Sequence, residues 1–174
     1  ELKGLDEAGK RPVILKRAHQ LKKITAGEPD TDNRIGIVHC VGGGFPLGGE
    51  IDEIDGRVAE LANRGVAYIT LAHLFWRRVA TNAPALPFLP DPVYKVIFCQ
   101  RRNAGLTEYG EEAVRAMHKH KVMIDVSHMR QDALDETLDL LRDLDNGADP
   151  KAFPVIASHA GYRFDKGKDY MLSE

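Results

Sequence analysis

Three of the seven histidines in this 174-residue chain end short apolar segments of strand type. The segments read Leu71-Ala72-His73, Val126-Ser127-His128 and Ala157-Ser158-His159. Parallel α/β sheets place their chemistry at the carboxyl ends of the strands, so we expect the three imidazoles to converge. A lone histidine of this kind is more often a hydrogen-bonded residue near the core, but three at one structural position favour a shared site. Imidazole is the usual zinc ligand there, and the pattern predicts a metal site.

The serine before two of these histidines raises the alternative of a serine hydrolase, in which histidine activates a hydroxyl. Neighbouring residues in a strand point to opposite faces of the sheet. We therefore expect that neither Ser127 nor Ser158 reaches the histidine that follows it, and we do not favour this alternative.

A glycine-rich segment, residues 42–49, follows the first clear apolar strand and raises the possibility of a phosphate-binding loop. It lacks the Gly-Lys-Ser/Thr ending of such loops, and Leu47 stands where a dinucleotide fingerprint needs Gly or Ala. We interpret the segment as a turn at the carboxyl edge of the sheet.

Two further histidines lie in the segment His118-Lys119-His120. The spacing of its histidines does not place them on one helix face. We interpret it as a cationic helix C-terminus that complements the helix dipole.

Apolar strand-like segments alternate with amphipathic helical segments along most of the chain. The expected strands are residues 35–41, 66–72, 122–127 and 153–158. The expected helices begin near Pro12, near Ile54, after Thr107 as N-cap and near Ala133. Strands that are apolar on both faces and alternate with helices predict an α/β fold with a parallel sheet, made of about four βα units.

The segment from His73 to Gly105 is too long for an ordinary connection between elements. Four prolines predict that it is non-helical: Pro84, Pro87, Pro90 and Pro92. Five aromatic residues lie in it: Phe75, Trp76, Phe88, Tyr94 and Phe98. Two interpretations of this segment remain open. It forms a pocket wall or a subunit contact, or it is a loop that packs on the chain's own core.

The composition is that of an ordinary globular protein, with 43% hydrophobic and 29% charged residues, and we expect a single domain over residues 1–174. The formal net charge of -2 argues against a nucleic-acid-binding protein. Two cysteines, Cys40 and Cys99, are too few for a disulfide framework and favour a reducing compartment. No apolar run approaches the roughly 20 residues of a membrane helix. With no secretory leader in sight either, we expect a cytoplasmic protein.

Four ordered motifs resemble the membrane (renal) dipeptidase family of zinc peptidases. They are Gly65-Val66-Ala67-Tyr68-Ile69-Thr70-Leu71-Ala72-His73, Gly105-Leu106-Thr107-Glu108-Tyr109-Gly110, Ile124-Asp125-Val126-Ser127-His128 and Pro154-Val155-Ile156-Ala157-Ser158-His159. The similarity extends from about Ile35 to His159. It implies a (β/α)8 TIM barrel of the amidohydrolase type, of which this chain holds a central part.

The resemblance also implies an activity and roles for individual residues. Members of the family hydrolyse dipeptides with two zinc ions, which share a bridging glutamate and a hydroxide that attacks the peptide carbonyl. By position, His128 and His159 correspond to the ligands of one zinc ion. His73 corresponds to the residue that contacts the substrate and stabilises the tetrahedral intermediate, and Arg163 to the arginine that holds the substrate carboxylate.

The sequence departs from the family pattern where the metals would bind. Gly42 occupies the position of the bridging glutamate, and the loss of that carboxylate should weaken both metal sites. None of the seven histidines is followed by Asp two residues on, so the family's His-x-Asp is not found. The catalytic aspartate of a late strand would lie beyond Glu174, so we expect about half a barrel.

The first hypothesis is therefore a zinc-dependent dipeptidase, or a fragment or diverged copy of one. The alternative is a non-catalytic descendant that binds a small molecule or peptide and has lost its metals. Gly42 favours this alternative, and the three retained histidines speak against it. An unrelated doubly wound hydrolase or nucleotide binder is a weaker third hypothesis. Half a barrel also leaves strand edges open, which predicts association of the chain as a homo-oligomer.

Overall fold

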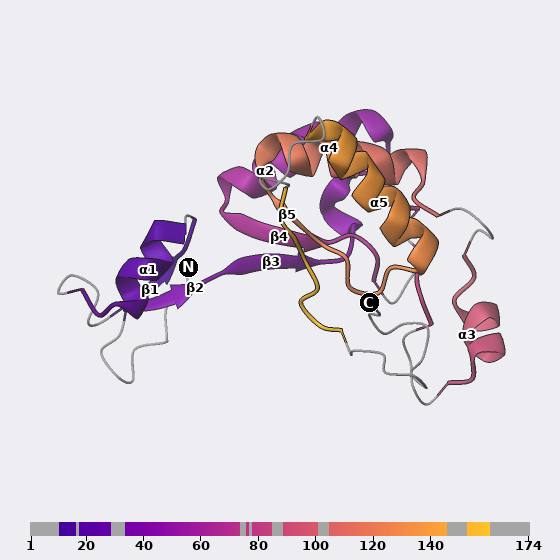
Figure 1. Cartoon of the computed structure of the whole chain (residues 1–174), viewed down its shortest axis with the longest axis horizontal. Helices are drawn as coiled ribbons and strands as arrows, with labels where there is room; N and C mark the ends of the chain where they lie inside the picture. The colour runs from indigo at the N-terminus through magenta and orange to yellow at the C-terminus, as the bar shows by residue number, and fades with distance from the viewer. Residues whose placement is uncertain are drawn as a thin grey trace.

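Four parallel strands form the larger sheet of this protein (Figure 1). The computed structural model describes residues 11–16, 18–28, 34–73, 76, 78–84, 89–100, 105–145 and 153–160. The strands are β3 (His39–Gly42), β4 (Val66–Thr70), β5 (Met123–Asp125) and β6 (Val155–Ile156). They pair in chain order, β3-β4-β5-β6, as consecutive strands of a (β/α)8 barrel do.

Three of the helices in the connections between these strands lie together on one side of the sheet (Figure 1). They are α2 (Ile54–Asn63), α4 (Glu108–His120) and α5 (Gln131–Leu144). Helices and sheet share one core, whose fully buried members include Ile54, Val58, Ile69, Leu71, Val114, Met117 and Ile124. Burial of each such side chain contributes about 1.5–3 kcal/mol to folding before entropy is counted. The predicted fold class, α/β with part of a (β/α)8 barrel, is confirmed.

Helix α4 illustrates how local sequence sets the ends of these elements. The hydroxyl of Thr107 accepts a hydrogen bond from the backbone N–H of Gly110 at 3.0 Å, as predicted for the N-cap. At the other end Lys121 adopts a left-handed conformation with φ 58°, which stops the helix. Strand β5 therefore begins only two residues later, at Met123.

A smaller unit precedes the main sheet and consists of β1 (Arg11–Ile14), α1 (Ala18–Thr25) and β2 (Arg34–Ile37). The expected helix is present as α1, but it begins at Ala18 and not near Pro12, because Pro12 lies in β1 and pairs in parallel with Ile35. Both strands of a two-stranded sheet are edges, where proline's missing N–H is tolerated. Figure 1 shows this unit beside the amino ends of the larger sheet.

The segment expected as one strand over residues 35–41 is divided between the two sheets. β2 ends at Ile37, β3 begins at His39, and Val38 between them is 50% exposed. Apolar periodicity did not reveal the break because the apolar run continues across it.

The long loop after β4 contains a short helix, α3 (Asp91–Ile97), so the prediction of a non-helical loop is wrong. Pro92 lies in the first turn of α3, where proline is tolerated because that N–H has no helical partner. Tyr94 is buried, and its ring centroid lies 4.8 Å from that of Phe98. The prolines therefore start a helix here and do not prevent one.

An earlier part of the same loop packs on the chain's own core. Residues 79–83 are at most 2% exposed, and Val79 and Ala80 belong to the core cluster. For this stretch the structure favours packing on the chain's own core over a subunit contact. Phe75 and Phe88, which belong to the aromatic set noted from the sequence, lie outside the described residues.

The helices of the described part are short. The longest, α5, has 14 residues and the next, α4, has 13, whereas a span of the bilayer needs roughly 20. None of them is long and apolar enough to cross a membrane.

Candidate functional site

The four strands of the larger sheet end in one row of residues. Gly42, Thr70, Asp125 and Ile156 are the last residues of β3, β4, β5 and β6, and each is in register with its neighbour in the sheet. This row marks the carboxyl edge of the sheet, where parallel α/β folds carry their chemistry.

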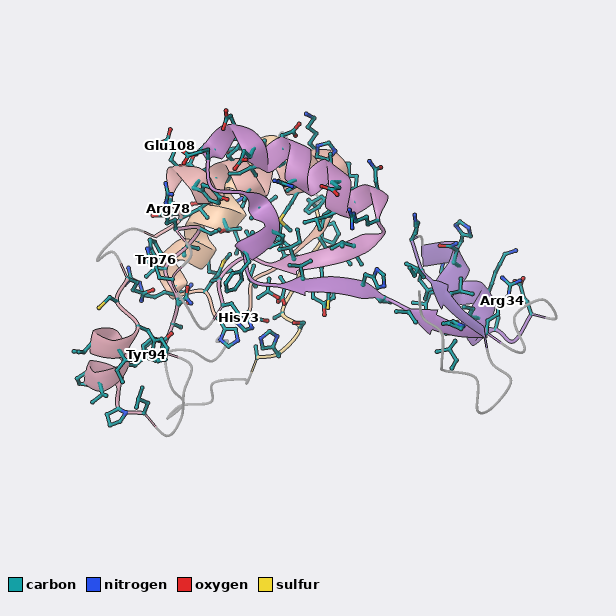
Figure 2. The ribbon with its side chains drawn as sticks, turned by 180° about the vertical axis from the view of Figure 1, so that it is seen from behind. Arg34, His73, Trp76, Arg78, Tyr94 and Glu108 are labelled. Carbon is teal, nitrogen blue, oxygen red and sulfur yellow. The ribbon has the colours of Figure 1, made fainter. Side chains whose placement is uncertain are left out.

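Each of the three histidines that follow these strands lies three residues beyond the row. This common offset brings His73, His128 and His159 together into a histidine cluster, in which one nitrogen of each lies within 4.8 Å of the other two. The Nε2 atoms of His128 and His159 are 2.7 Å apart. The ring centroid of His73 lies 5.1 Å from that of His128 and 6.1 Å from that of His159. Figure 2 shows His73 at this edge, far from Arg34 of the N-terminal unit.

Burial and the neighbouring imidazoles make His128 and His73 harder to protonate. Burial, followed by repulsion from the positive charges of His159 and His73, lowers the pKa of His128 to about 4. Burial and then the charge of His159 also lower the pKa of His73 below its usual 6.5. A metal ligand must offer a nitrogen lone pair, which only a neutral imidazole has. Near pH 7 these two side chains are in the form that binds a metal.

The backbone of His128 is held in a tight turn. Its φ of 66° lies in the left-handed region, which residues other than glycine rarely adopt. The carbonyl of His128 accepts a hydrogen bond from the N–H of Ala83 at 2.8 Å, and the N–H of Met129 donates to the carbonyl of Val126 at 3.2 Å. Such backbone conformations cluster at functional sites.

Asp125 supports the cluster from beneath and was not singled out from the sequence. Its carboxylate is fully buried and accepts five hydrogen bonds, from the Thr70 hydroxyl and from the N–H and hydroxyl groups of Ser127 and Ser158. Burial opposes its ionisation, but the hydrogen bonds from Ser127, Ser158 and Thr70 outweigh it and lower the pKa of Asp125 to about 2. The available signal was a charged residue inside an otherwise apolar strand.

The expectation that neither serine reaches its own histidine is wrong for Ser158. The Ser158 Oγ lies 2.7 Å from the Nδ1 of His159. Alternation of side chains does not apply here because β6 ends at Ile156 and the two residues lie in a bend after it. The Ser158 hydroxyl also contacts Asp125 at 2.6 Å, so it is a link between a carboxylate and an imidazole.

Comparison with known families decides the family of this chain. The model of the membrane dipeptidase family, peptidase family M19, matches residues 9–164. The chain belongs to this family. The resemblance seen in the four sequence motifs is thereby confirmed, and the matched range includes the four-stranded sheet and the histidine cluster.

Solved structures have a similar fold. The probable dipeptidase PvdM from Pseudomonas aeruginosa superposes with a TM-score of 0.68 at 23% identity, over 97% of this chain and 35% of that one. An amidohydrolase from Pseudomonas aeruginosa gives 0.65 at 17% identity, over 97% and 41%. A metallo peptidase from Rhodobacter sphaeroides, liganded with a phosphinate mimic of the dipeptide L-Ala-D-Ala, gives 0.53 at 17% identity, over 95% and 39%. This chain therefore spans 35–41% of the length of these proteins.

Gly42 is the place at which this member of the membrane dipeptidase family lacks an expected side chain. A Cβ at Gly42 would lie 3.8 Å from the Nε2 of His73 and would meet nothing closer. A longer side chain would therefore have room to extend toward the histidine cluster. Among the described residues, the group of possible metal ligands consists of the three histidines and includes no carboxylate.

The residues present fit one zinc ion. Zinc binds imidazole nitrogens at about 2.0–2.1 Å, which places two such nitrogens about 3.3 Å apart around a tetrahedral ion. The Nε2 atoms of His128 and His159, 2.7 Å apart, reach this separation with a small ring movement. Among the described residues no carboxylate joins this group, so the shared glutamate that the resemblance implies for a second ion has no counterpart there. Arg163, expected to hold the substrate carboxylate, lies outside the described residues.

Proposed function

We propose that this chain provides the zinc-binding histidines of a dipeptidase, and that the whole protein hydrolyses the peptide bond of dipeptides. In this proposal His128 and His159 hold a zinc ion and His73 contacts the substrate. The observation that carries it is the convergence of the three imidazoles, one nitrogen of each within 4.8 Å of the others. Membership of the membrane dipeptidase family supports the reaction class.

The chemistry divides between the metal and the chain's own residues. When bound, zinc supplies polarisation of the peptide carbonyl and activation of the attacking water. His128 and His159 present nitrogen lone pairs from two adjacent strands. His73, whose ring centroid lies 5.1 Å from that of His128, donates a hydrogen bond to the carbonyl oxygen as negative charge develops on it. Arg163 would hold the substrate carboxylate.

Gly42 restricts what this chain does by itself. Without a carboxylate at that position two zinc ions would be poorly neutralised, so the described residues support one ion only. We therefore expect weaker zinc binding than in a site bridged by glutamate, and little or no dipeptide hydrolysis by this chain alone.

The test is the zinc content of the purified, dialysed chain, measured by elemental analysis. We expect about one zinc ion per chain, lost in His128→Ala and in His159→Ala. His19→Ala is the matched control, because His19 is exposed on α1 in the N-terminal unit, which Figure 2 shows far from His73. Zinc no higher than background in the native chain would contradict the proposal and leave the metal-free binding protein as the better hypothesis.

A further inference from the structure

A hydroxyl group joins the buried carboxylate of the site to one imidazole of the cluster. The Oγ of Ser158 lies 2.6 Å from Oδ2 of Asp125 and 2.7 Å from Nδ1 of His159. The carboxylate itself is 4.0 Å from the same Nδ1, which is too far for a direct hydrogen bond. The only polar link from Asp125 to the ring of His159 among the described contacts therefore passes through Ser158.

The direction of the hydrogen bonds follows from the surroundings of Asp125. Its Oδ1 accepts from two backbone N–H groups and from the Ser127 hydroxyl, and its Oδ2 accepts from the hydroxyls of Thr70 and Ser158. An ionised carboxylate can only accept hydrogen bonds. All five groups around Asp125 donate to it, so a protonated Asp125 would have no acceptor for its hydrogen. Ser158 has one hydroxyl hydrogen, which it donates to Asp125. In its contact with His159, the Ser158 oxygen must therefore be the acceptor, and Nδ1 of His159 must be the donor.

We propose that Asp125, acting through Ser158, holds His159 as the tautomer with hydrogen on Nδ1 and thereby presents the Nε2 lone pair to the histidine cluster. Asp125 and Ser158 are positioning residues in this arrangement, since neither contacts the metal position directly. The purpose of the arrangement rests on the proposed zinc site, whereas the tautomer itself does not depend on it.

A second link from the same carboxylate fixes the backbone of His159. The hydroxyl of Ser127 donates to Oδ1 of Asp125 at 2.6 Å and accepts a hydrogen bond from the backbone N–H of His159 at 3.2 Å. The ring and the backbone of His159 are thus linked to one carboxylate by two serines, each of which follows the end of a different strand. The opposite tautomer would turn the Ser158 hydrogen toward His159 and remove a donor from a buried charge, which is unfavourable.

The arrangement also determines the neighbouring ring in the metal-free chain. The Nε2 atoms of His128 and His159 are 2.7 Å apart, so one of them donates to the other. Because His159 offers a lone pair there, His128 carries its hydrogen on Nε2. The two histidines are therefore expected as opposite tautomers, and only His128 has to give up its Nε2 hydrogen when a metal binds.

The first test is a long-range 1H–15N correlation spectrum of the metal-free full chain at about pH 8, where imidazoles are neutral. We expect His159 with hydrogen on Nδ1 and His128 with hydrogen on Nε2. This measurement on the native chain needs no variant to fold. Hydrogen on Nε2 of His159 would overturn the proposal.

Variants then distinguish the effect of the relay, the chain of hydrogen bonds from Asp125 through Ser158 to His159, from an effect of packing alone. Ser158→Ala should shift His159 toward the other tautomer and weaken zinc binding about 10–100-fold, and Ser158→Thr, which keeps the hydroxyl, should restore both. Ser127→Ala is the matched control, because it removes a serine from the same carboxylate without touching the ring of His159. An unchanged tautomer in Ser158→Ala, or an equal shift in Ser127→Ala, would also overturn the proposal. The expected tautomer in a chain that binds no zinc would refute the proposed zinc site and leave the relay standing.

Discussion

Five of the seven histidines in this protein form two contrasting groups. In the histidine cluster the rings contact one another, and among the described contacts none of their nitrogens has a hydrogen bond to a carboxylate. At the C-terminal end of α4 each histidine has one: the Nε2 of His118 lies 2.9 Å from Asp145 and the Nε2 of His120 lies 2.9 Å from Asp55. The two groups contain the same side chain in opposite electrostatic surroundings.

The contrast shows how strongly the environment of a histidine differs between the two groups. At α4 the hydrogen bond from His118 lowers the pKa of Asp145, and those from Lys119 and His120 lower the pKa of Asp55. These carboxylates connect α4 to other elements and occupy the ring nitrogens. The segment interpreted from the sequence as a cationic helix end is thus paired with acids. In the cluster, lone pairs remain available for a ligand.

The largest expected effect is on the carboxylate that supports the cluster. Asp125→Ala removes the acceptor of five hydrogen bonds inside the core, so the donors left behind lose their partners. We expect the free energy of unfolding, measured with urea, to fall by about 3 kcal/mol or more. Asp139→Ala is the control, since its exposed pair with Arg142 contributes about 0–1 kcal/mol. Equal losses of unfolding free energy in the two variants would show that the hydrogen bonds to Asp125 do not stabilise the site.

The second prediction gives the cluster the carboxylate that it lacks. Gly42→Glu should increase zinc affinity at least about tenfold, because the side chain extends toward His73 from a position with open space. Gly42→Gln, of equal size and without charge, should give a much smaller gain. Zinc titration by calorimetry measures both. If the two variants bind zinc equally, the missing charge at Gly42 does not explain weak binding.

The third prediction compares one substitution in each group of histidines. His118→Ala removes the bond to Asp145 and a ring contact with Phe153, whose centroid is 5.1 Å away, so stability should fall by about 1 kcal/mol while zinc binding stays unchanged. His128→Ala should do the reverse, abolishing zinc binding with little change in stability. Urea unfolding and elemental analysis on both variants provide the comparison. Loss of zinc in His118→Ala would contradict the division into two groups.

Sequence patterns predicted the carboxyl edge of the sheet and the histidines on it better than the hydrogen bonds around Asp125. His73, His128 and His159 were found because parallel strands repeat one geometry, so a common offset from each strand's end is readable as a pattern. The role of Asp125 was missed because the groups that bond to it come from β4 and from the turns after β5 and β6. The contact of Ser158 with its neighbour was missed because it depends on β6 ending after only two residues.

The start of helix α4, which has a local signal, was predicted well, whereas strand β1, which depends on a distant contact, was not. Helix α4 has its own cap in Thr107, and its start was predicted correctly. Pro12 was read as a helix start, but pairing with Ile35, more than 20 residues away, makes the segment a strand. Conversely, Pro92 lies in the first turn of α3, in a segment where prolines were expected to prevent a helix. A proline is thus compatible with both structures, and for Pro12 the pairing with Ile35, outside its own segment, decides between them.

The smallest expected effect concerns the acid limb of stability at the α4 group. Asp145 accepts hydrogen bonds from His118 at 2.9 Å and from the N–H of Phe153 at 2.6 Å, and these lower its pKa below the ordinary 3.8. Because the folded pKa lies below the unfolded one, the contribution of Asp145 is present above pH 3.8 and is lost as the pH falls through the folded value. Urea midpoints of the native chain and Asp145→Asn should therefore differ at neutral pH and converge in acid. A difference that persists in acid would mean that the pair contributes by shape alone, and the contrast between the two histidine groups would then not be one of charge.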